Sequence, residues 1–194
     1  MDNKENILEC ALHLFFKRGY DTVGVQEIAE VSGVTKPTLY YYFKSKNGLL
    51  KSLIEKKGSI LLQDIKEAVS GMEVGDVQGK LLHLARAYID FGVKEEEFYF
   101  FMLSLMYSPR ENEAYLTIIP LIREQYYLVT KVFEQAAASL GNMNGRQEQF
   151  AAGFLGTLHC FMMVQSEKGI EMQTIRNDAT AYAIVHQFLH GIYS

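Results

Sequence analysis

The segment from Val34 to Lys46, VTKPTLYYYFKSK, carries an unusual density of aromatic and basic side chains. Three tyrosines and a phenylalanine follow one another shortly after a proline, and lysines lie on both sides of them. Four consecutive residues of a helix point around more than half of its circumference, so a core cannot bury all of them. The outer lysines and tyrosine hydroxyls are groups that bind phosphate oxygens. An isolated aromatic run is more often part of a core, so contact with a nucleic acid is favoured only in combination with the glycine turn described below.

The charge of the chain is distributed unevenly, in agreement with this interpretation. The 194 residues have a formal net charge of -4, but residues 1–57 hold nine Lys/Arg against seven Asp/Glu. The remainder holds ten basic and sixteen acidic residues. Two parts with opposite charge are expected to have different partners.

Two short predicted helices position the basic aromatic segment. Apolar spacing predicts one helix over 25–31 and another over 36–43, joined by a tight turn that contains Gly33. Two short helices around a glycine turn are typical of a helix-turn-helix, whose second helix enters the major groove of DNA. Leu39 and Phe43 are four residues apart and are predicted to pack inward. The outward residues are then Thr35, Lys36, Thr38, Tyr41 and Tyr42.

Each outward residue type has a group that suits a DNA duplex. Thr35 and the free amides of the first turn can hold a phosphate, and Pro37 in that turn loses no hydrogen bond. Lys36 can reach a guanine edge or a phosphate. The hydroxyls of Tyr41 and Tyr42 can reach phosphate oxygens. Lys46 lies near the start of the next predicted helix, whose dipole favours an anion.

Residues 25–50, VQEIAEVSGVTKPTLYYYFKSKNGLL, resemble the DNA-binding domain of the TetR family of bacterial transcriptional regulators. With the first predicted helix, over 3–18, the resemblance covers about the first quarter of the chain. It implies DNA contacts for Lys36, Pro37, Thr38, Tyr41 and Tyr42, and a phosphate contact for Lys46. The predicted DNA-binding set is Thr35, Lys36, Pro37, Thr38, Tyr41, Tyr42 and Lys46.

This chain departs from the family pattern at two places. Val23-Gly24 stands where the family usually has Thr-Ser, which removes a phosphate-binding hydroxyl unless Thr22 substitutes. Asn47 stands near a position that is commonly glutamate, and Gly48 follows in the first turn of a helix, where glycine is unfavourable.

The rest of the chain is also predicted to be helical, which makes the protein all-α. Ser45 is expected to cap a long helix that reaches about residue 70, and residues 71–79 are glycine-rich and predicted to be a loop. Further helices are expected at about 80–92, 95–107, 112–140, 146–168 and 175–192, with a kink or a new start at Pro120. We expect a three-helix DNA-binding domain over 1–46 and a helical effector-binding and dimerisation domain over 47–194.

The C-terminal part is rich in Phe, Tyr and Met, for which an ordinary core is the simplest explanation. The resemblance implies in addition a cavity for a small effector that releases DNA. We expect an apolar or aromatic effector, because few charges interrupt these faces. The candidate wall residues are Phe101, Met102, Tyr127 and Met162.

Small residues in the last two predicted helices indicate a dimer interface. Faces that mix small and large apolar residues allow close approach of helices, so a two-fold four-helix interface is expected, although an intramolecular core uses the same pattern. The candidate contact residues are Gly153, Gly156, Ala179 and Ala183.

Other function classes find little support in the sequence. His186 and His190 have metal-ligand spacing, but no further ligand lies nearby in the sequence, and Cys10 and Cys160 are expected to be buried thiols. The charged N-terminus does not fit a secretory signal, and no apolar run is long enough to cross a membrane, so a cytoplasmic protein is expected. We expect no cofactor, no metal and no enzyme activity. Repression is the expected mode; an activator, a ligand-independent regulator, and a helical carrier or enzyme remain the alternatives.

Overall fold

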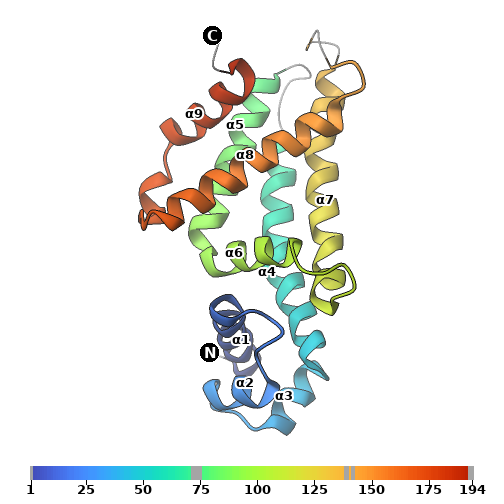
Figure 1. The fold of residues 1–194 in the computed structure, drawn as a ribbon, viewed down its shortest axis with the longest axis vertical. Coiled ribbons are helices and arrows are strands. Elements are labelled where there is room, and N and C mark those ends of the chain that lie inside the picture. Colours follow the sequence, from blue (N-terminus) through green and yellow to red (C-terminus); the bar gives the residue numbers. More distant parts are fainter. Residues whose placement is uncertain (1, 71–75, 138–139, 141–142, 192–194) are drawn as a thin grey trace. The chain divides into compact units, whose positions relative to one another are not determined.

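The computed structural model describes residues 2–70, 76–137, 140 and 143–191 of the chain, and these ranges contain helices and no strand (Figure 1). The predicted all-α class is therefore confirmed. The helices are α1 (Asn3–Arg18), α2 (Val25–Val31), α3 (Lys36–Phe43), α4 (Lys46–Val69), α5 (Val77–Lys94), α6 (Glu96–Met106), α7 (Glu113–Ala136), α8 (Gln147–Glu167), the 3-10 helix η1 (Met172–Ile175) and α9 (Asp178–His190).

The chain divides into two compact units. The first unit contains residues 1–59 and 95–122, and the second contains residues 60–94 and 123–194. The first unit thus joins the predicted DNA-binding segment to α6 and to the start of α7. The predicted functional boundary after residue 46 stays a prediction.

The core of the first unit holds α1, α2 and α3 together. Ile7 and Phe15 of α1, Ile28 of α2 and Leu39 of α3 have no exposed surface. Phe15 also stacks on Phe101 of α6, with ring centroids 5.6 Å apart. Burial of a large apolar side chain contributes about 1.5 to 3 kcal/mol. Helix α1 is therefore packed against α6 as well as against the helix-turn-helix.

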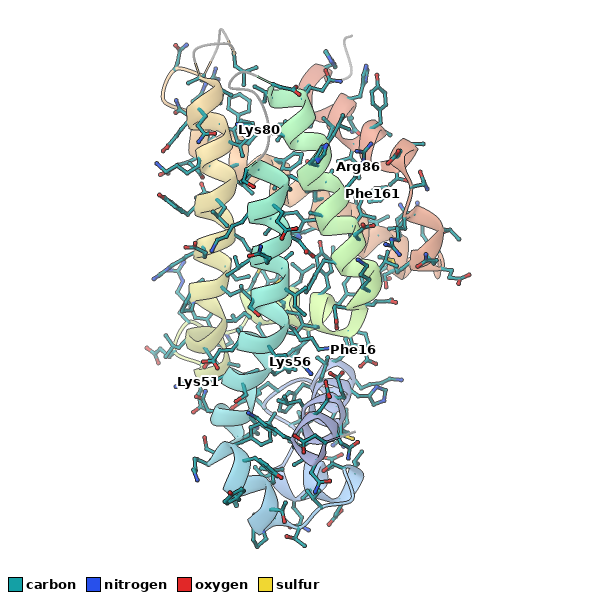
Figure 2. All side chains as sticks on the ribbon, turned by 180° about the vertical axis from the view of Figure 1, so that it is seen from behind. Phe16, Lys51, Lys56, Lys80, Arg86 and Phe161 are labelled. Carbon is teal, nitrogen blue, oxygen red and sulfur yellow. The ribbon has the colours of Figure 1, made fainter. Side chains whose placement is uncertain are left out.

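A cluster of ion pairs ties α1 to α4 and to the start of α6, and its Lys56 is labelled in Figure 2. Lys56 of α4 lies 2.5 Å from Glu5 of α1. Lys57 is nearly buried and lies 3.0 Å from Glu9 and 2.6 Å from Glu95. Desolvation opposes the charge of Lys57, but its hydrogen bonds to Glu95 and Glu9 raise its pKa above the ordinary value. This pairing keeps the nearly buried ammonium of Lys57 charged. The ion pairs of Lys57 hold α1 and the start of α6 against α4.

The structure explains why glycine occupies position 48, which the sequence alone does not. The helix α3 ends at Phe43, and the φ of 66° at its C-cap residue Lys44 turns the chain sharply into Ser45. The hydroxyl of Ser45 accepts a hydrogen bond from the amide of Gly48 at 2.9 Å, which confirms Ser45 as the cap of α4. A Cβ atom on Gly48 would overlap the carbonyl oxygen of Phe43. The close approach of α4 to the end of α3 therefore requires glycine here.

Gly48→Ala is expected to destabilise the protein, although the same change in an ordinary helix interior stabilises by about 1 kcal/mol. Because the overlapping atom belongs to the backbone of Phe43, we expect a loss of about 1 to 3 kcal/mol. Urea unfolding followed by circular dichroism measures it. Gly24→Ala is the control, since its φ of -92° is ordinary and a Cβ there meets no atom within 4 Å. A Gly48→Ala protein as stable as the wild type would contradict this explanation.

Two local expectations are wrong, and one alternative is excluded. Pro120 lies inside the continuous helix α7, so it does not start a new helix, and a kink at Pro120 stays a prediction. The helix α5 begins at Val77, within the predicted loop, because the carboxylate of Asp76 accepts a hydrogen bond from the amide of Gly79 at 2.8 Å; residues 71–75 lie outside the described residues. Cys160 is exposed and Cys10 is half-buried, whereas both thiols were expected in the core.

The second unit packs α5 against α8, α9 and η1, and it buries several polar groups. The hydroxyl of Tyr88 on α5 donates to Gln125 on α7 at 3.1 Å, and the Tyr88 ring meets His159 of α8 edge-on at 5.6 Å. Burial lowers the pKa of His159 to about 4, so its imidazole is neutral at neutral pH. In the described part of the chain, no helix is long and apolar enough to cross a membrane.

Candidate DNA-binding site

The turn between α2 and α3 has the geometry of a helix-turn-helix. Gly33 has a φ of 68°, a left-handed conformation that favours glycine. The hydroxyl of Ser32 donates to the carbonyl of Ile28 at 2.6 Å, and the amide of Val34 donates to the carbonyl of Ala29 at 3.0 Å. These hydrogen bonds occupy backbone carbonyls in the last turn of α2 and set the direction in which α3 begins.

The aromatic run of α3 divides between the core and the surface. Leu39 and Phe43 are buried, as predicted. Tyr41 is 74% exposed, and Tyr42 meets it edge-on with ring centroids 5.3 Å apart. Tyr40 is 38% exposed. The outer face of α3 therefore presents phenol rings and hydroxyls to a partner, while Leu39 and Phe43 on its inner face pack in the core.

The first turn of α3 is capped and bears an exposed lysine. Thr35 is the N-cap residue, and its hydroxyl accepts from the amide of Thr38 at 3.3 Å. The two threonine hydroxyls lie 2.8 Å apart. Pro37 occupies the first turn. Lys36 is exposed, with its ammonium 5.9 Å from the centroid of the Tyr40 ring. Hydroxyls, an ammonium and a helix N-terminus are thus adjacent, an arrangement suited to phosphate and base contacts.

Lys46 differs from the other predicted contacts because its ammonium is engaged within the protein. It donates to the backbone carbonyls of Tyr20 at 2.8 Å, Val23 at 3.0 Å and Asp21 at 3.4 Å. It also lies 4.2 Å from the centroid of the Tyr20 ring. Desolvation by burial lowers the pKa of Lys46. The phosphate contact of Lys46 stays a prediction, and the structure gives this residue a role inside the fold.

Sequence reasoning missed a group of residues that hold the turn between α1 and α2. The hydroxyl of Tyr20 donates to Glu113 at 2.9 Å, and the side-chain amide of Asn112 donates to Asp21 at 2.8 Å. Burial and the Glu113 carboxylate raise the pKa of Tyr20, so the phenol stays protonated and donates a hydrogen bond to Glu113. About ninety residues separate Tyr20 and Asp21 from Asn112 and Glu113, and no local pattern in the sequence signals the pairing.

The predicted effector residues fall into different units. Phe101 and Met102 are buried in the first unit. Met162 is buried in the second unit, whereas Tyr127 is 53% exposed there, with the ammonium of Lys131 5.3 Å from its ring centroid. Their role as the wall of an effector cavity stays a prediction.

The predicted dimer residues share an exposed face of α8 and α9. Gly153, Gly156, Ala179 and Ala183 are all exposed. Gly153 and Gly156 line a shallow groove of about 550 Å³ with Cys160, Phe161, Val164 and Ile184 among its other residues. Met163, Val164 and Tyr182 add exposed apolar surface, at 50%, 38% and 51% exposure. The two glycines thus lie beside apolar residues of α8 and α9, and the contact of all four small residues with a second chain stays a prediction.

The N-terminal residues match a known family. Residues 7–53 match the family described as "Bacterial regulatory proteins, tetR family". The HTH-type transcriptional activator FasR of Mycolicibacterium smegmatis is 30% identical over 90 residues, which are 46% of this chain and 40% of that protein. The chain thus matches less than half of the length of this curated relative.

Solved structures share the fold along nearly the whole chain. The transcriptional regulator FadR from Bacillus subtilis, in complex with stearoyl-CoA, covers 97% of this chain and 99% of its own, with a TM-score of 0.79 and 18% identity. The MbdR regulator from Azoarcus sp. CIB covers 99% and 100%, with a TM-score of 0.83 and 20% identity. The helix-turn-helix of α2 and α3 lies within residues 7–53, so this N-terminal part of the chain is a DNA-binding domain of the TetR family of bacterial regulatory proteins, and the chain as a whole shares the fold of the solved transcriptional regulators.

Proposed function

We propose that this protein binds a palindromic operator as a homodimer in the cytoplasm and represses transcription until a small apolar effector binds. The observation that carries the proposal is the outer face of α3. Lys36, Thr38 and Tyr41 are presented on a short helix whose inner residues are fully packed. A rigid helix with such side chains is what reading of a major groove requires.

The proposed homodimer rests on the exposed face of α8 and α9. Its apolar side chains and its groove would be covered by the same face of a second chain, since a two-fold interface is self-complementary. Two helix-turn-helix domains joined through one dimer interface can read half-sites about 34 Å apart. A palindromic operator follows from this symmetry.

The proposed effector is an apolar molecule, for which long-chain acyl-CoA is the first candidate. The fold is shared with the FadR structure that contains stearoyl-CoA, and the described helices of the second unit bury Phe, Leu and Met side chains. An effector releases DNA only if it binds the DNA-incompetent conformation more tightly than the competent one. Aromatic compounds such as phenolics are the second class to test.

The test measures operator binding by fluorescence anisotropy while stearoyl-CoA is added. A coupling of about 1 to 3 kcal/mol would lower operator affinity about 5- to 150-fold, and operator DNA would weaken ligand binding by the same factor. Coenzyme A and free stearate serve as controls for the head group and for detergent-like effects. A ligand that raises the Tm of the protein and leaves operator affinity unchanged would contradict release by that ligand.

A transcriptional activator is the second candidate, because FasR of Mycolicibacterium smegmatis is named an activator. A reporter gene placed behind the operator distinguishes the two. Repression predicts higher reporter expression when the gene for this protein is deleted, and activation predicts lower expression.

A further inference from the structure

The turn between α1 and α2 is held from two directions at once. From the start of α4, Lys46 donates to three of its backbone carbonyls, those of Tyr20, Asp21 and Val23. From the start of α7, Glu113 accepts from the hydroxyl of Tyr20, and Asn112 donates to the carboxylate of Asp21. All of these residues lie in the first unit.

Tyr20 cannot move alone within this arrangement. It is only 5% exposed, and its ring packs between Phe15, at 5.2 Å between centroids, and the ammonium of Lys46, at 4.2 Å. Phe15 belongs to the same core as Leu39 of α3. Lys46 is the first residue of α4, two residues after Lys44, the C-cap of α3. A displacement of Tyr20 therefore changes the direction in which α3 is presented.

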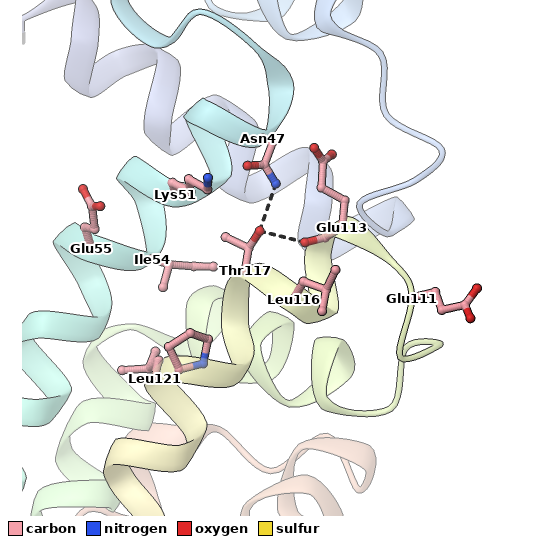
Figure 3. Close-up of a pocket in the computed structure, with 10 residues that line it drawn as sticks. Asn47, Lys51, Ile54, Glu55, Glu111, Glu113, Leu116, Thr117 and Leu121 are labelled. Carbon is pink, nitrogen blue, oxygen red and sulfur yellow. Dashed lines mark hydrogen bonds between the residues drawn. The ribbon is translucent and has the colours of Figure 1, made fainter.

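The first turn of α7 is itself fixed and also contacts α4. The side-chain oxygen of Asn112 accepts from the amide of Ala114 at 2.7 Å, which orients the Asn112 amide group toward Asp21. The hydroxyl of Thr117 accepts from Asn47 at 2.9 Å and donates to the carbonyl of Glu113 at 2.7 Å (Figure 3). One turn of α7 thus contacts both the α1–α2 turn and the first turn of α4.

We infer that Tyr20, Asn112 and Glu113 are positioning residues for DNA binding, which hold the α1–α2 turn, and with it α3, against the first turn of α7. Lys46 belongs to the same set and acts through the turn carbonyls. The inference rests on the proposed DNA binding. It places part of the control of operator affinity in residues 112–117, more than sixty residues beyond the helix-turn-helix.

The test is a set of variants measured for operator affinity and for its salt dependence. Tyr20→Phe keeps the buried ring and removes only the hydroxyl, and Glu113→Ala removes its acceptor. Each is expected to lower affinity by about tenfold or more, because a hydrogen bond to a charged group is lost. Because both changes break the same bond, the double variant should be no weaker than the more affected single variant. Glu113→Gln, whose amide oxygen can still accept from Tyr20, should regain most of the affinity.

The salt slope separates positioning from phosphate contact. A residue that neutralises a phosphate contributes about one unit to the slope of log K against log salt, whereas a positioning residue contributes none. We expect Lys46→Met to lower affinity with the slope unchanged. A slope smaller by about one unit would assign Lys46 to a phosphate and overturn its positioning role.

A matched control removes a neighbouring charge. Glu111→Ala takes an exposed carboxylate from the segment before α7 and should leave operator affinity unchanged. Wild-type protein that binds no operator would overturn the proposed function and this inference with it. Wild-type binding with unchanged affinity in Tyr20→Phe and Glu113→Ala would overturn the inference alone, and circular dichroism confirms that each variant is folded.

Discussion

Replacing Lys36, Thr38 and Tyr41 together with alanine is expected to lower operator affinity at least 100-fold. Each of these side chains lies on the outer face of α3, and a direct base or phosphate contact contributes about 1 to 3 kcal/mol. Loss of the Lys36 charge should also reduce the salt slope by up to about one unit. The measurement is anisotropy titration of a labelled operator at several salt concentrations.

The same variant should keep the stability of the wild type, since the buried side chains Leu39 and Phe43 are untouched. Lys168→Ala, at an exposed position just after α8, is the control for loss of one positive charge. A triple variant that binds the operator as tightly as the wild type would end the assignment of α3 as the DNA-reading helix.

Gly156→Glu is expected to produce monomers that no longer bind the operator tightly. Gly156 lies in the groove of the α8 and α9 face, and a Cβ added there meets no atom of its own chain within 4 Å. The fold therefore tolerates a side chain at this position, while a carboxylate in a two-fold apolar interface would be buried next to its own copy. Sedimentation velocity measures the change in mass, and anisotropy measures the loss of affinity.

Gly156→Ala provides the matched control, because it adds a methyl group without a charge. Circular dichroism should show the same helix content in both variants. An intact dimer in Gly156→Glu would place the interface on another surface, and a monomer that still binds the full operator tightly would contradict the need for a dimer.

The helix-turn-helix was predictable because its determinants are local. The turn glycine, the four-residue spacing of Leu39 and Phe43 and the cap at Ser45 each depend on neighbours within a few residues, and the structure has all three. The bounds of α1, α2 and α3 follow from the same short-range signals.

Features that depend on distant residues were not predictable in this way. The helix propensity of glycine makes Gly48 look unfavourable, and only the close approach of Phe43 explains it. The phosphate contact that the charge of Lys46 suggests stays a prediction, while its hydrogen bonds to carbonyls of a turn more than twenty residues earlier have no local signal in the sequence. Composition suggested Phe101 and Tyr127 as walls of one cavity; Phe101 is buried in the first unit and Tyr127 is 53% exposed in the second, and their role in a cavity stays a prediction.

The central claim is specific binding of a dimer to a palindromic site. The direct measurement is selection of bound duplexes from a random-sequence pool, followed by determination of the affinity and stoichiometry on the selected sequence at a stated salt concentration. We expect an inverted repeat with half-site centres about one helical turn or a small multiple of it apart, and specific binding about a thousandfold or more tighter than binding to random DNA. We also expect one or more whole dimers per duplex. Selection of no common sequence, or equal affinity for the selected and the random duplex, would contradict the central claim.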